Sequence, residues 1–438
     1  MKESQVLERP LRRARQRARL ALLLASALAA PAEAGVVAVL EASGDRTAPG
    51  RLERLLETSA GEDFDPARWD DDLARLRRTE LFYEVQGATT AVPGGVAARV
   101  AAKNKHSTLP VLKVKQGGGS SLLTLGLYDV NLARRLLEAG GQFERFNGRN
   151  GFAFWFRHPY GGGPRVRLGA DVVAHTIDLP LLDVHGRPEA HFLNEESRAT
   201  LRSSFEAGRR IRTDLNVSVY RNVFKQDDST PLKSGRNAAF RAAQPLRSGL
   251  TASLLPKIAY GRLERAPTFL TGWEAAVGGE LAAKALGSDF SFARGELELT
   301  GGLLPHPAWN IAAQARLGTK TGRDFQHKHY LGGLDSVRGF LDGQLRGDQF
   351  WHVNLEARPT LLERPSAVLQ GNLFTDWAKT WDARAFGAEG FHDPVTSVGV
   401  GARLILPRVY RAVLRTDFAW TLRPIRRFGF SLGLQQFF

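Results

Sequence analysis

The sequence predicts a mainly β protein: a transmembrane antiparallel β-barrel of sixteen strands, preceded by one small α+β domain. Three observations predict it. The first 34 residues have the pattern of an export signal, and alternating apolar and polar runs recur through the chain from residue 109 to 438. The last twelve residues form one further alternating run that ends on an aromatic residue. Residues 35–108 lie between signal and barrel and mix helical with strand periodicity.

Residues 1–34 have the three parts of a secretory signal peptide. A basic segment precedes an apolar run from Leu20 to Ala30, which is too short to span a bilayer, and Ala32-Glu33-Ala34 offers a cleavage site before Gly35. A mitochondrial presequence is the alternative. The Leu/Ala block followed by a small-x-small site favours export.

Charge and cysteine content narrow the possible partners only slightly. Removing residues 1–34 takes away seven basic and three acidic residues, so the formal charge falls from +15 to +11. A basic exported chain can bind anionic lipid, polyanions or acidic substrates, and net charge does not choose among them. Because the chain has no cysteine, disulfides and thiolate metal sites are excluded.

Residues 35–108 are predicted to form a β-α-α-β-β domain. A first strand, 36–40, leads to a helix opened by Thr47 and Pro49, and a second helix starts at Asp65-Pro66. A hairpin then turns at Pro93-Gly94-Gly95. The predicted inward residues are Leu52, Leu55 and Leu56 on the first helix and Trp69, Leu73 and Leu76 on the second, whereas Asp70-Asp71-Asp72 is expected on a solvated face.

The rest of the chain consists of period-2 runs. Runs such as 309–318, 397–404 and 410–420 are about ten residues long with aromatic residues near their ends, as a tilted strand needs to cross the hydrocarbon. After the signal no apolar run is long enough for a transmembrane helix. A soluble β-sandwich also alternates, but it needs neither an export signal nor a terminal Phe. Five strands can be placed after residue 340 and ten or eleven before 330, which gives sixteen as the closed even number.

The final run resembles the carboxy-terminal assembly signal of bacterial outer-membrane barrels. In RFGFSLGLQQFF, the apolar residues fall on one face of a strand and the chain ends on Phe. The residues that carry this resemblance are Phe430, Leu432, Leu434 and Phe438.

The stretch YLGGLDSVRGF, residues 330–340, places an arginine, Arg338, in an apolar turn between two strands. It resembles the loop signature of the BamA/TamA-type outer-membrane assembly family, which joins POTRA domains to sixteen-stranded barrels and also includes the two-partner secretion transporters. The resemblance implies that the loop folds back into the barrel and that its arginine meets carboxylates on the inner wall. The motif residues are Gly332, Gly333, Val337, Gly339 and Phe340.

Strand parity supplies the partners of Arg338. Glu356 in NLEARP alternates with lipid-facing residues, as does Asp376 in FTDWA, so both carboxylates point to the lumen. Both also match family positions, although Ala378 stands where the family has glycine. Two carboxylates would hold the guanidinium firmly, since removing one partner of a buried pair typically costs about 3 to 5 kcal/mol. The alternative is an ordinary solvated loop arginine, and the intact motif favours the lock.

Two further resemblances concern the ends of the barrel. The β-α-α-β-β order, with Phe82-Tyr83-Glu84-Val85 opening the second strand, resembles a single POTRA domain, although Thr79 stands near the place of an expected glycine. A plain α+β domain is the alternative. LLTLGLYDVNLARRLLEAGGQFERF resembles the first barrel strands, whose pairing with the last strand forms a seam. The preceding Gly117 to Ser121 either weakens that seam or links the two domains.

No catalytic arrangement is predicted, so an enzyme is not expected. There is no G-x-S-x-G nucleophile elbow, and His327-Lys328-His329 is expected to be solvated rather than to bind a metal. No cofactor, metal or nucleic-acid partner is expected.

Assembly, insertion or translocation of other proteins at the bacterial outer membrane is the function that the family resemblance implies, with the N-terminal domain in the periplasm. The expected partners are outer-membrane lipid, unfolded or client outer-membrane or secreted proteins, and periplasmic proteins or lipoproteins. Two alternatives stay open: a secretion transporter of the two-partner type, and a non-catalytic structural or pore-forming barrel.

Overall fold

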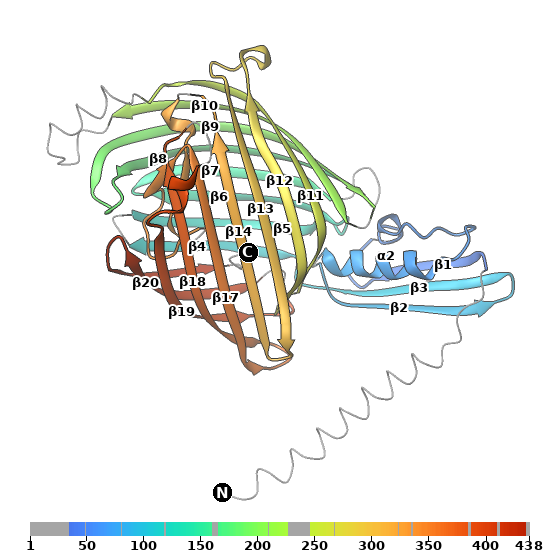
Figure 1. Ribbon diagram of the computed structural model, residues 1–438. Coiled ribbons are helices and arrows are strands. Elements are labelled where there is room, and N and C mark those ends of the chain that lie inside the picture. Colours follow the sequence, from blue (N-terminus) through green and yellow to red (C-terminus); the bar gives the residue numbers. More distant parts are fainter. Residues whose placement is uncertain are drawn as a thin grey trace, which may run out of the picture.

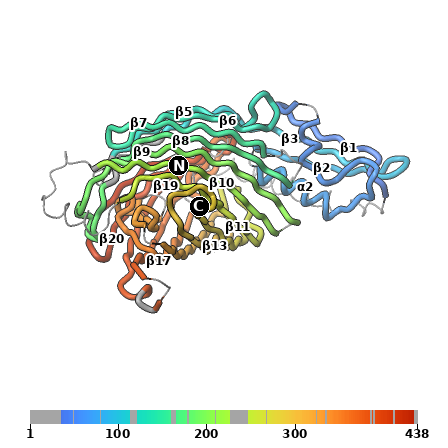
Figure 2. Tube along the Cα trace, turned by 90° about the horizontal axis from the view of Figure 1, so that it is seen from above, coloured from blue at the N-terminus to red at the C-terminus, as the bar shows by residue number. Residues whose placement is uncertain are grey.

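The computed structural model describes residues 35–434 except 49, 80, 118–119, 160–164, 209, 227–245, 267, 323, 334–335, 384–386 and 410–411. The predicted signal peptide and Phe438 lie outside the described residues. Figure 1 shows a small domain beside one end of a large barrel, and the view from above in Figure 2 agrees. We call that end of the barrel proximal and the opposite end distal. No helix in the described part of the chain is long and apolar enough to cross a membrane.

The N-terminal domain is a three-stranded sheet covered by one helix. Its elements are β1 (Val37–Gly44), the 3-10 turn η1 (Glu53–Leu55), α2 (Pro66–Arg78), β2 (Phe82–Val92) and β3 (Gly95–Asn104). The sheet order is β1-β3-β2, with β1 parallel and β2 antiparallel to β3. Among the described residues, β2 therefore ends the sheet and has one edge without a strand partner. The predicted hairpin at residues 93–95 forms this β2–β3 turn.

The first predicted helix is wrong, because only a three-residue 3-10 turn forms there. Gly50 before it has φ of +70°, and Leu56 after it is extended. The next two amides, of Glu57 and Thr58, donate to the Asp72 carboxylate at 2.8 and 2.9 Å instead of continuing the helix. The three predicted leucines, Leu52, Leu55 and Leu56, are nonetheless buried.

Helix α2 forms where the sequence predicts it. Asp65 caps its first turn by accepting a hydrogen bond from the Ala67 amide at 2.8 Å, and Pro66 occupies the first helical position. Trp69, Leu73 and Leu76 face the sheet and are buried. Asp72 was expected to be solvated, but it is 0% exposed, since it binds the two amides above and Arg75 at 2.7 Å.

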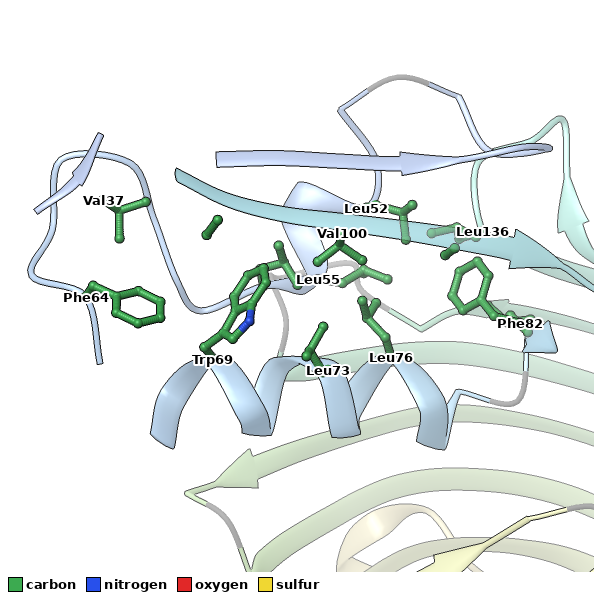
Figure 3. Close-up of a cluster of buried hydrophobic side chains, with 14 of the residues drawn as sticks. Val37, Leu52, Leu55, Phe64, Trp69, Leu73, Leu76, Phe82, Val100 and Leu136 are labelled. Atoms are coloured by element: carbon green, nitrogen blue, oxygen red, sulfur yellow. The ribbon is translucent and has the colours of Figure 1, made fainter. Parts of the chain in front are cut away.

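The hydrophobic core of this domain includes residues of the barrel. Leu109, Val130 and Leu136, which belong to the first barrel strand and to the hairpin that follows it, are buried in the same cluster as Leu52 and Val100. Figure 3 shows Leu136 between Leu52 and Phe82. Backbone hydrogen bonds reinforce the contact, such as that from the Ala48 amide to the Arg134 carbonyl at 2.8 Å. The two parts therefore share one core and are held in a fixed relation.

The barrel is one antiparallel sheet of sixteen strands, which confirms the predicted fold class and strand number. Each strand pairs with the next one in the chain, except that β14 pairs with β17 across an inserted hairpin. The strands are β4 (Thr108–Gly117), β5 (Ser120–Leu132), β6 (Leu137–Phe146), β7 (Arg149–His158), β8 (Val166–Leu182), β9 (Pro188–Ala207), β10 (Ile211–Gln226), β11 (Gly249–Arg265), β12 (Leu270–Ala282), β13 (Phe292–His306), β14 (Trp309–Lys320), β17 (Gln349–Glu363), β18 (Val368–Trp381), β19 (Val395–Ile405), β20 (Val413–Arg423) and β21 (Arg427–Leu434).

The glycine-rich segment is part of the barrel rather than a linker between domains. Gly117 is the last residue of β4 and pairs with Ser120, the first residue of β5. The stretch LLTLGLYDVNLARRLLEAGGQFERF, which resembles the first barrel strands, therefore begins within β5, the second strand of the barrel. β4 has a weak strand signal in the sequence, because TLPVLKVKQG contains a proline and follows β3 almost directly.

β4 and β21 meet at the seam of the barrel. They are the two ends of the hydrogen-bonding order of the sheet, and they lie side by side. All other neighbours in the order are joined by ladders, whereas no ladder joins β4 to β21 in the part of the chain that the structure describes. At the proximal end, the His106 amide just before β4 donates to the Arg408 carbonyl at 3.2 Å, which ties β4 to the β19–β20 turn.

The segment between β14 and β17 is the inserted loop. It contains η3 (Phe325–His327) and a small hairpin of β15 (His329–Leu331) and β16 (Leu345–Gly347). Two further 3-10 turns, η2 (Lys284–Leu286) and η5 (Ala388–Phe391), lie in distal connections. The β15–β16 hairpin presents residues 332–344, which include the motif identified in the sequence.

Candidate functional site: a loop held in the barrel lumen

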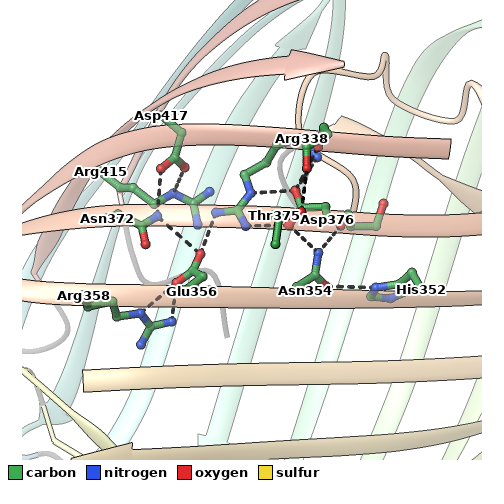
Figure 4. A network of polar contacts seen from close by, with 12 residues as sticks. Arg338, His352, Asn354, Glu356, Arg358, Asn372, Thr375, Asp376, Arg415 and Asp417 are labelled. Carbon is green, nitrogen blue, oxygen red and sulfur yellow. Dashed lines mark hydrogen bonds and ion pairs between the residues drawn. The ribbon is translucent and has the colours of Figure 1, made fainter. Parts of the chain in front are cut away.

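The inward faces of four neighbouring strands form a polar patch opposite the loop. On β17 to β20 the residues of one parity are buried and many of them are polar, while the residues that alternate with them are more exposed and mostly apolar. Figure 4 shows Arg338 beside Asp376 and Glu356, with further polar side chains of the wall joined to these two acids. The patch consists of His352, Asn354, Glu356, Arg358, Gln370, Asn372, Asp376, Ser397, Arg403, Arg415 and Asp417.

Arg338 reaches both carboxylates that strand parity assigned to it. Its Nε and Nη2 donate to the two Asp376 oxygens at 2.9 and 2.6 Å, and its backbone amide donates to the same carboxylate at 3.0 Å. Its Nη1 donates to Glu356 Oε1 at 2.6 Å. The guanidinium carbon lies 3.5 Å from the centre of the Phe374 ring, and the residue is only 1% exposed. The loop arginine is therefore a buried group bound on three sides.

Glu356 is a shared acceptor for three guanidinium groups. Besides Arg338, its second oxygen accepts from Arg358 Nε at 2.7 Å and from Arg403. On β20, Arg415 pairs with Asp417 at 3.0 Å, and the Asn372 amide donates to both Glu356 and Asp417. Strand parity could have found these arginines and Asp417, because all of them stand at inward positions of predicted strands.

Four buried arginines thus face three buried carboxylates. Arg338, Arg358, Arg403 and Arg415 carry positive charge at any ordinary pH, so the acids Glu356, Asp376 and Asp417 are surrounded by an excess of one cation. A guanidinium does not release its proton near neutral pH. The chemistry of this cluster is consequently binding and positioning of the loop.

The glycines and apolar residues of the motif seat the loop on the wall. Gly332, Gly333 and Gly339 all have positive φ, of +126°, +74° and +89°. A Cβ on Gly339 would meet Thr421 at 2.9 Å, so the backbone lies against β20 there. Val337 and Phe340 are buried in one cluster with Phe350 and Ala378.

Ala378 stands where the family resemblance expects glycine, and the loop still packs directly against it. Its methyl group is fully buried in the cluster with Val337 and Phe340, beside Leu331 and Leu345 of the loop hairpin. The extra carbon is therefore accommodated by apolar packing of the loop. Asp376, two residues before it, still reaches Arg338.

The loop also reaches the opposite wall. The Gln344 side chain donates to the Val184 carbonyl in the β8–β9 connection at 2.8 Å, and Arg346 pairs with Glu189 at the start of β9. On the other side, Asn354 of β17 donates to the Ser336 carbonyl at 2.6 Å. The loop therefore crosses the distal part of the lumen and binds both sides.

The expectation that His327-Lys328-His329 is solvated is wrong. Both histidines are buried, since His327 stacks on Phe292 with ring centres 4.0 Å apart and His329 lies 3.5 Å from Glu296. They face different partners rather than a common point. Within the described residues, no group of three or more His, Cys, Asp or Glu could hold a metal ion.

The predicted assembly signal lies on the last strand. Phe430 is exposed on the outer face of β21, where its ring packs 5.3 Å from that of Phe418 on β20. Leu432 follows at the next outward position, and Leu434 pairs in register with Leu414. Phe438 lies outside the described residues.

These features define a class of protein: an outer-membrane β-barrel of sixteen strands whose lumen holds an inserted loop, with a small domain packed on one end. The chain belongs to the Omp85 superfamily, because the model of the Omp85 superfamily domain matches residues 137–436. The match begins at β6 and includes the whole loop and the polar patch.

Solved structures agree with the fold. BamA from Haemophilus ducreyi lacking POTRA domains 1–3 is 15% identical and matches with a TM-score of 0.57, covering 91% of this chain and 83% of that one. CdiB from Acinetobacter baumannii is 14% identical, with a TM-score of 0.60 and coverage of 92% and 74%. CdiB from Escherichia coli is 11% identical, with a TM-score of 0.63 and coverage of 91% and 76%. No curated protein sequence matches the chain.

Proposed function

We propose that this barrel inserts or translocates other proteins at the bacterial outer membrane by opening its wall between β4 and β21. Membership of the Omp85 superfamily supports the general activity. The observation that carries the route is the seam, where the two end strands lie together without a ladder among the described residues. Unpaired N–H and C=O groups at a sheet edge form a template for an incoming strand.

The N-terminal domain acts in this proposal as a single periplasmic POTRA domain. Its sheet offers the free edge of β2, to which an extended client segment could add as a further strand. The solved relatives support this reading. Their matches cover more than nine tenths of the chain, and the barrel from residue 108 to 434 makes up only about three quarters of it.

Arg338, Glu356 and Asp376 act in this proposal as a lock between the loop and the wall. The hydrogen bonds of Arg338 to Asp376 and Glu356 hold the loop across the lumen at rest. With the loop held across the lumen, the seam is the proposed path for a client strand.

A disulfide across the seam tests the route. The chain has no cysteine, so an introduced pair is the only one. Leu112→Cys on the outer face of β4 is combined in turn with Phe428→Cys, Phe430→Cys or Leu432→Cys on β21, and the pair that oxidises is kept. We expect oxidation to stop insertion of client barrels and reduction to restore it. Phe418→Cys with Phe430→Cys is the control, because it joins two strands that are already paired; insertion unaffected by a closed seam would refute the proposal.

Secretion of a polypeptide through the lumen is the second candidate. The observation that favours it is the loop itself, which crosses the distal lumen and is held by ion pairs that could exchange partners. Ser336→Cys with Asn354→Cys fixes the loop on β17, since these residues touch. Secretion lost on fixing the loop but kept on closing the seam would favour this second candidate. A chain indifferent to both disulfides would be a structural or pore-forming barrel.

A further inference from the structure

A basic cavity lies at the proximal rim, between the C-terminal end of α2 and the barrel turns β9–β10 and β11–β12. Its volume is about 210 Å³. The lining is strongly cationic: six arginines and two glutamates surround it. They are Arg78, Arg167, Arg210, Arg212, Arg262 and Arg265 with Glu206 and Glu274.

The two glutamates are already engaged. Glu206 pairs with Arg167, and Glu274 pairs with Arg212 at 3.2 Å. In contrast, Arg78, Arg210 and Arg262 form no ion pair or side-chain hydrogen bond with the residues that the structure describes. Three guanidinium groups therefore share one cavity without a bound acid.

The adjoining cavity differs in its charge balance. It is lined by five arginines and by four acids, including Glu57 and Glu206, so its charges nearly cancel. Arg78 and Arg262 line both cavities. The excess of positive charge is thus confined to the rim side.

The pKa of Arg78 reflects its burial and the positive charges around it. Burial lowers the pKa of its guanidinium below the usual range, Glu206 acts in the opposite direction, and the charges of Arg262 and Arg75 lower it further. An anion bound between these groups would relieve both the burial and the repulsion.

The cavity stands at the level where a bilayer meets water. Arg262 is the cross-strand partner of Trp273, so the two side chains lie on the same outer face. Trp273 is 48% exposed and packs against the exposed ring of Tyr260, with ring centres 5.9 Å apart. Exposed Trp and Tyr near strand ends mark the interfacial belt of a membrane barrel. Ile211, which is exposed on this outer face, adds apolar surface to the cavity.

We propose that this cavity binds the phosphate group of an anionic phospholipid from the membrane leaflet at the proximal end. Arginine forks match phosphate oxygens in a bidentate manner, and three of them here have no acid partner among the described residues. An acidic peptide would meet the same charge. The aromatic belt and the apolar lining favour a lipid, whose acyl chains can follow the outer wall beside Trp273.

The test uses the mature chain in bilayer discs that contain phosphatidylcholine with a small fraction of phosphatidylglycerol. Lipid retained on the protein is identified and counted by native mass spectrometry after detergent extraction. We expect phosphatidylglycerol to be enriched on the native protein. Arg78→Gln and Arg262→Gln should each weaken the enrichment about fivefold, the usual contribution of one basic residue at a membrane surface.

Matched variants separate the cavity from general charge. Arg364→Gln removes an exposed arginine from the turn between β17 and β18, at the same end of the barrel but outside the cavity, and should leave the enrichment unchanged. Arg78→Lys keeps the positive charge but lacks the forked guanidinium, so it should weaken the enrichment less than Arg78→Gln. The lysine variant also provides the measurement if Arg78→Gln folds poorly.

Two competitors distinguish the source of the anion. Inorganic phosphate should displace the lipid only at high concentration, because it lacks acyl chains. Displacement at equal concentration by an acidic peptide, or equal losses from Arg364→Gln and Arg262→Gln, would overturn the proposal. Insertion of client proteins is measured in parallel. This shows separately whether the cavity binds lipid and whether the barrel inserts clients, so that failure of one proposal is distinguished from failure of the other.

Discussion

At the residue scale, Arg338 is more tightly bound to Asp376 than to Glu356. Asp376 accepts three hydrogen bonds from Arg338, whereas Glu356 accepts one. Within the described residues, Asp376 also accepts hydrogen bonds from the neutral side chains of Asn354 and Ser397. Glu356 keeps two other guanidinium partners when Arg338 is removed. The coupling between Arg338 and Asp376 should therefore exceed that between Arg338 and Glu356.

A double-mutant cycle measures this difference. Arg338→Ala leaves Asp376 buried without a cation, so we expect it to destabilise the barrel by about 3 to 5 kcal/mol. Asp376→Ala should cost a similar amount, and the double variant little more than either one. The measurement is unfolding by urea in lipid vesicles, with the exposed Arg364→Ala as the control.

Glu356→Ala provides the comparison within the cluster. It removes a carboxylate that binds Arg358, Arg403 and one arm of Arg338, so it should destabilise more than Asp376→Ala, and its cost should add largely to that of Arg338→Ala. Additive costs for Arg338 with Asp376 would contradict the lock.

Gly339→Ala tests how closely the loop must approach the wall. Gly339 has φ of +89°, and a Cβ there would lie 2.9 Å from Thr421 and 3.3 Å from Ala419. We expect the loop to lift from β20 and to become sensitive to protease added from the distal side. Gly343→Ala is the matched control in the same loop, because it also has positive φ, of +65°, but its Cβ would meet only Tyr330 at an ordinary 3.5 Å. Equal protease sensitivity of the two variants would show that backbone strain, not the wall contact, matters.

Strand parity explains why the site could be predicted residue by residue. On β17 and β18 one face must be apolar for lipid, so the polar residues of opposite parity, including Glu356 and Asp376, can only face inward. The same rule covers Arg403 and Asp417. It fails for His327 and His329, since they stand in a loop with no lipid face, where burial depends on long-range contacts with Phe292, Glu296 and Phe350.

At the element scale, the β5–β6 hairpin joins the barrel to the N-terminal domain. Leu136 enters the domain core with 2% exposure and φ of +58°, and Asn131 ties the hairpin to the domain by donating to the Arg46 carbonyl at 2.8 Å. The sequence did not predict this shared core, because hydrophobic periodicity describes each element alone and does not say which distant elements pack together. The first predicted helix failed for a related reason, since Asp72 binds the two amides that would have continued it.

Leu136→Ala should loosen the N-terminal domain from the barrel. Truncating a buried leucine costs about 2 to 5 kcal/mol, and here the lost contacts lie between the two parts. We expect faster proteolytic release of the domain with little change in barrel unfolding. Leu132→Ala in the same hairpin is the control, since Leu132 is exposed. Release equally fast in both variants would mean that the hairpin does not hold the domain.

The second attachment should respond to acid. Glu57 before α2 accepts two hydrogen bonds from Arg165 at 2.9 and 2.6 Å, and this pairing, helped by Arg75 and opposed by burial, lowers the pKa of Glu57 from 4.5. A lowered folded pKa means that the contact stabilises docking above pH 4.5 and is lost as the pH falls through the folded value.

A distance probe between domain and barrel should therefore report constant docking from neutral pH down to about 4.5 and loosening below it. Glu57→Gln should abolish the transition, while Glu41→Gln, which removes an exposed pair within the domain, should keep it. A transition that persists in Glu57→Gln would assign it to another group.

At the scale of the whole molecule, the contacts that secure the N-terminal domain lie at the proximal end of the barrel, whereas the loop and the open part of the seam lie at the distal end. The domain core, the Glu57–Arg165 pair and the His106–Arg408 hydrogen bond all secure the proximal end. The loop is held by side-chain ion pairs. The distal part of the seam has no ladder of backbone hydrogen bonds within the described residues. Opening should therefore begin at the distal end and leave the N-terminal domain in place.

Replacing residues 329–347 by a short Gly-Ser linker tests whether the loop closes the lumen. The hairpin binds β17, β18 and β20 on one side and the β8–β9 connection on the other, so its removal should leave an open path through the barrel. We expect a stable, large conductance in planar bilayers from the shortened chain, brief openings from Arg338→Ala, and mostly closed behaviour from the native protein. Shortening the distal β12–β13 connection around η2 is the control, since that turn does not contribute to the lock. If the native protein already conducts as much as the shortened chain, the loop does not seal the lumen. The argument that clients pass through the seam because the lumen is closed would then fail.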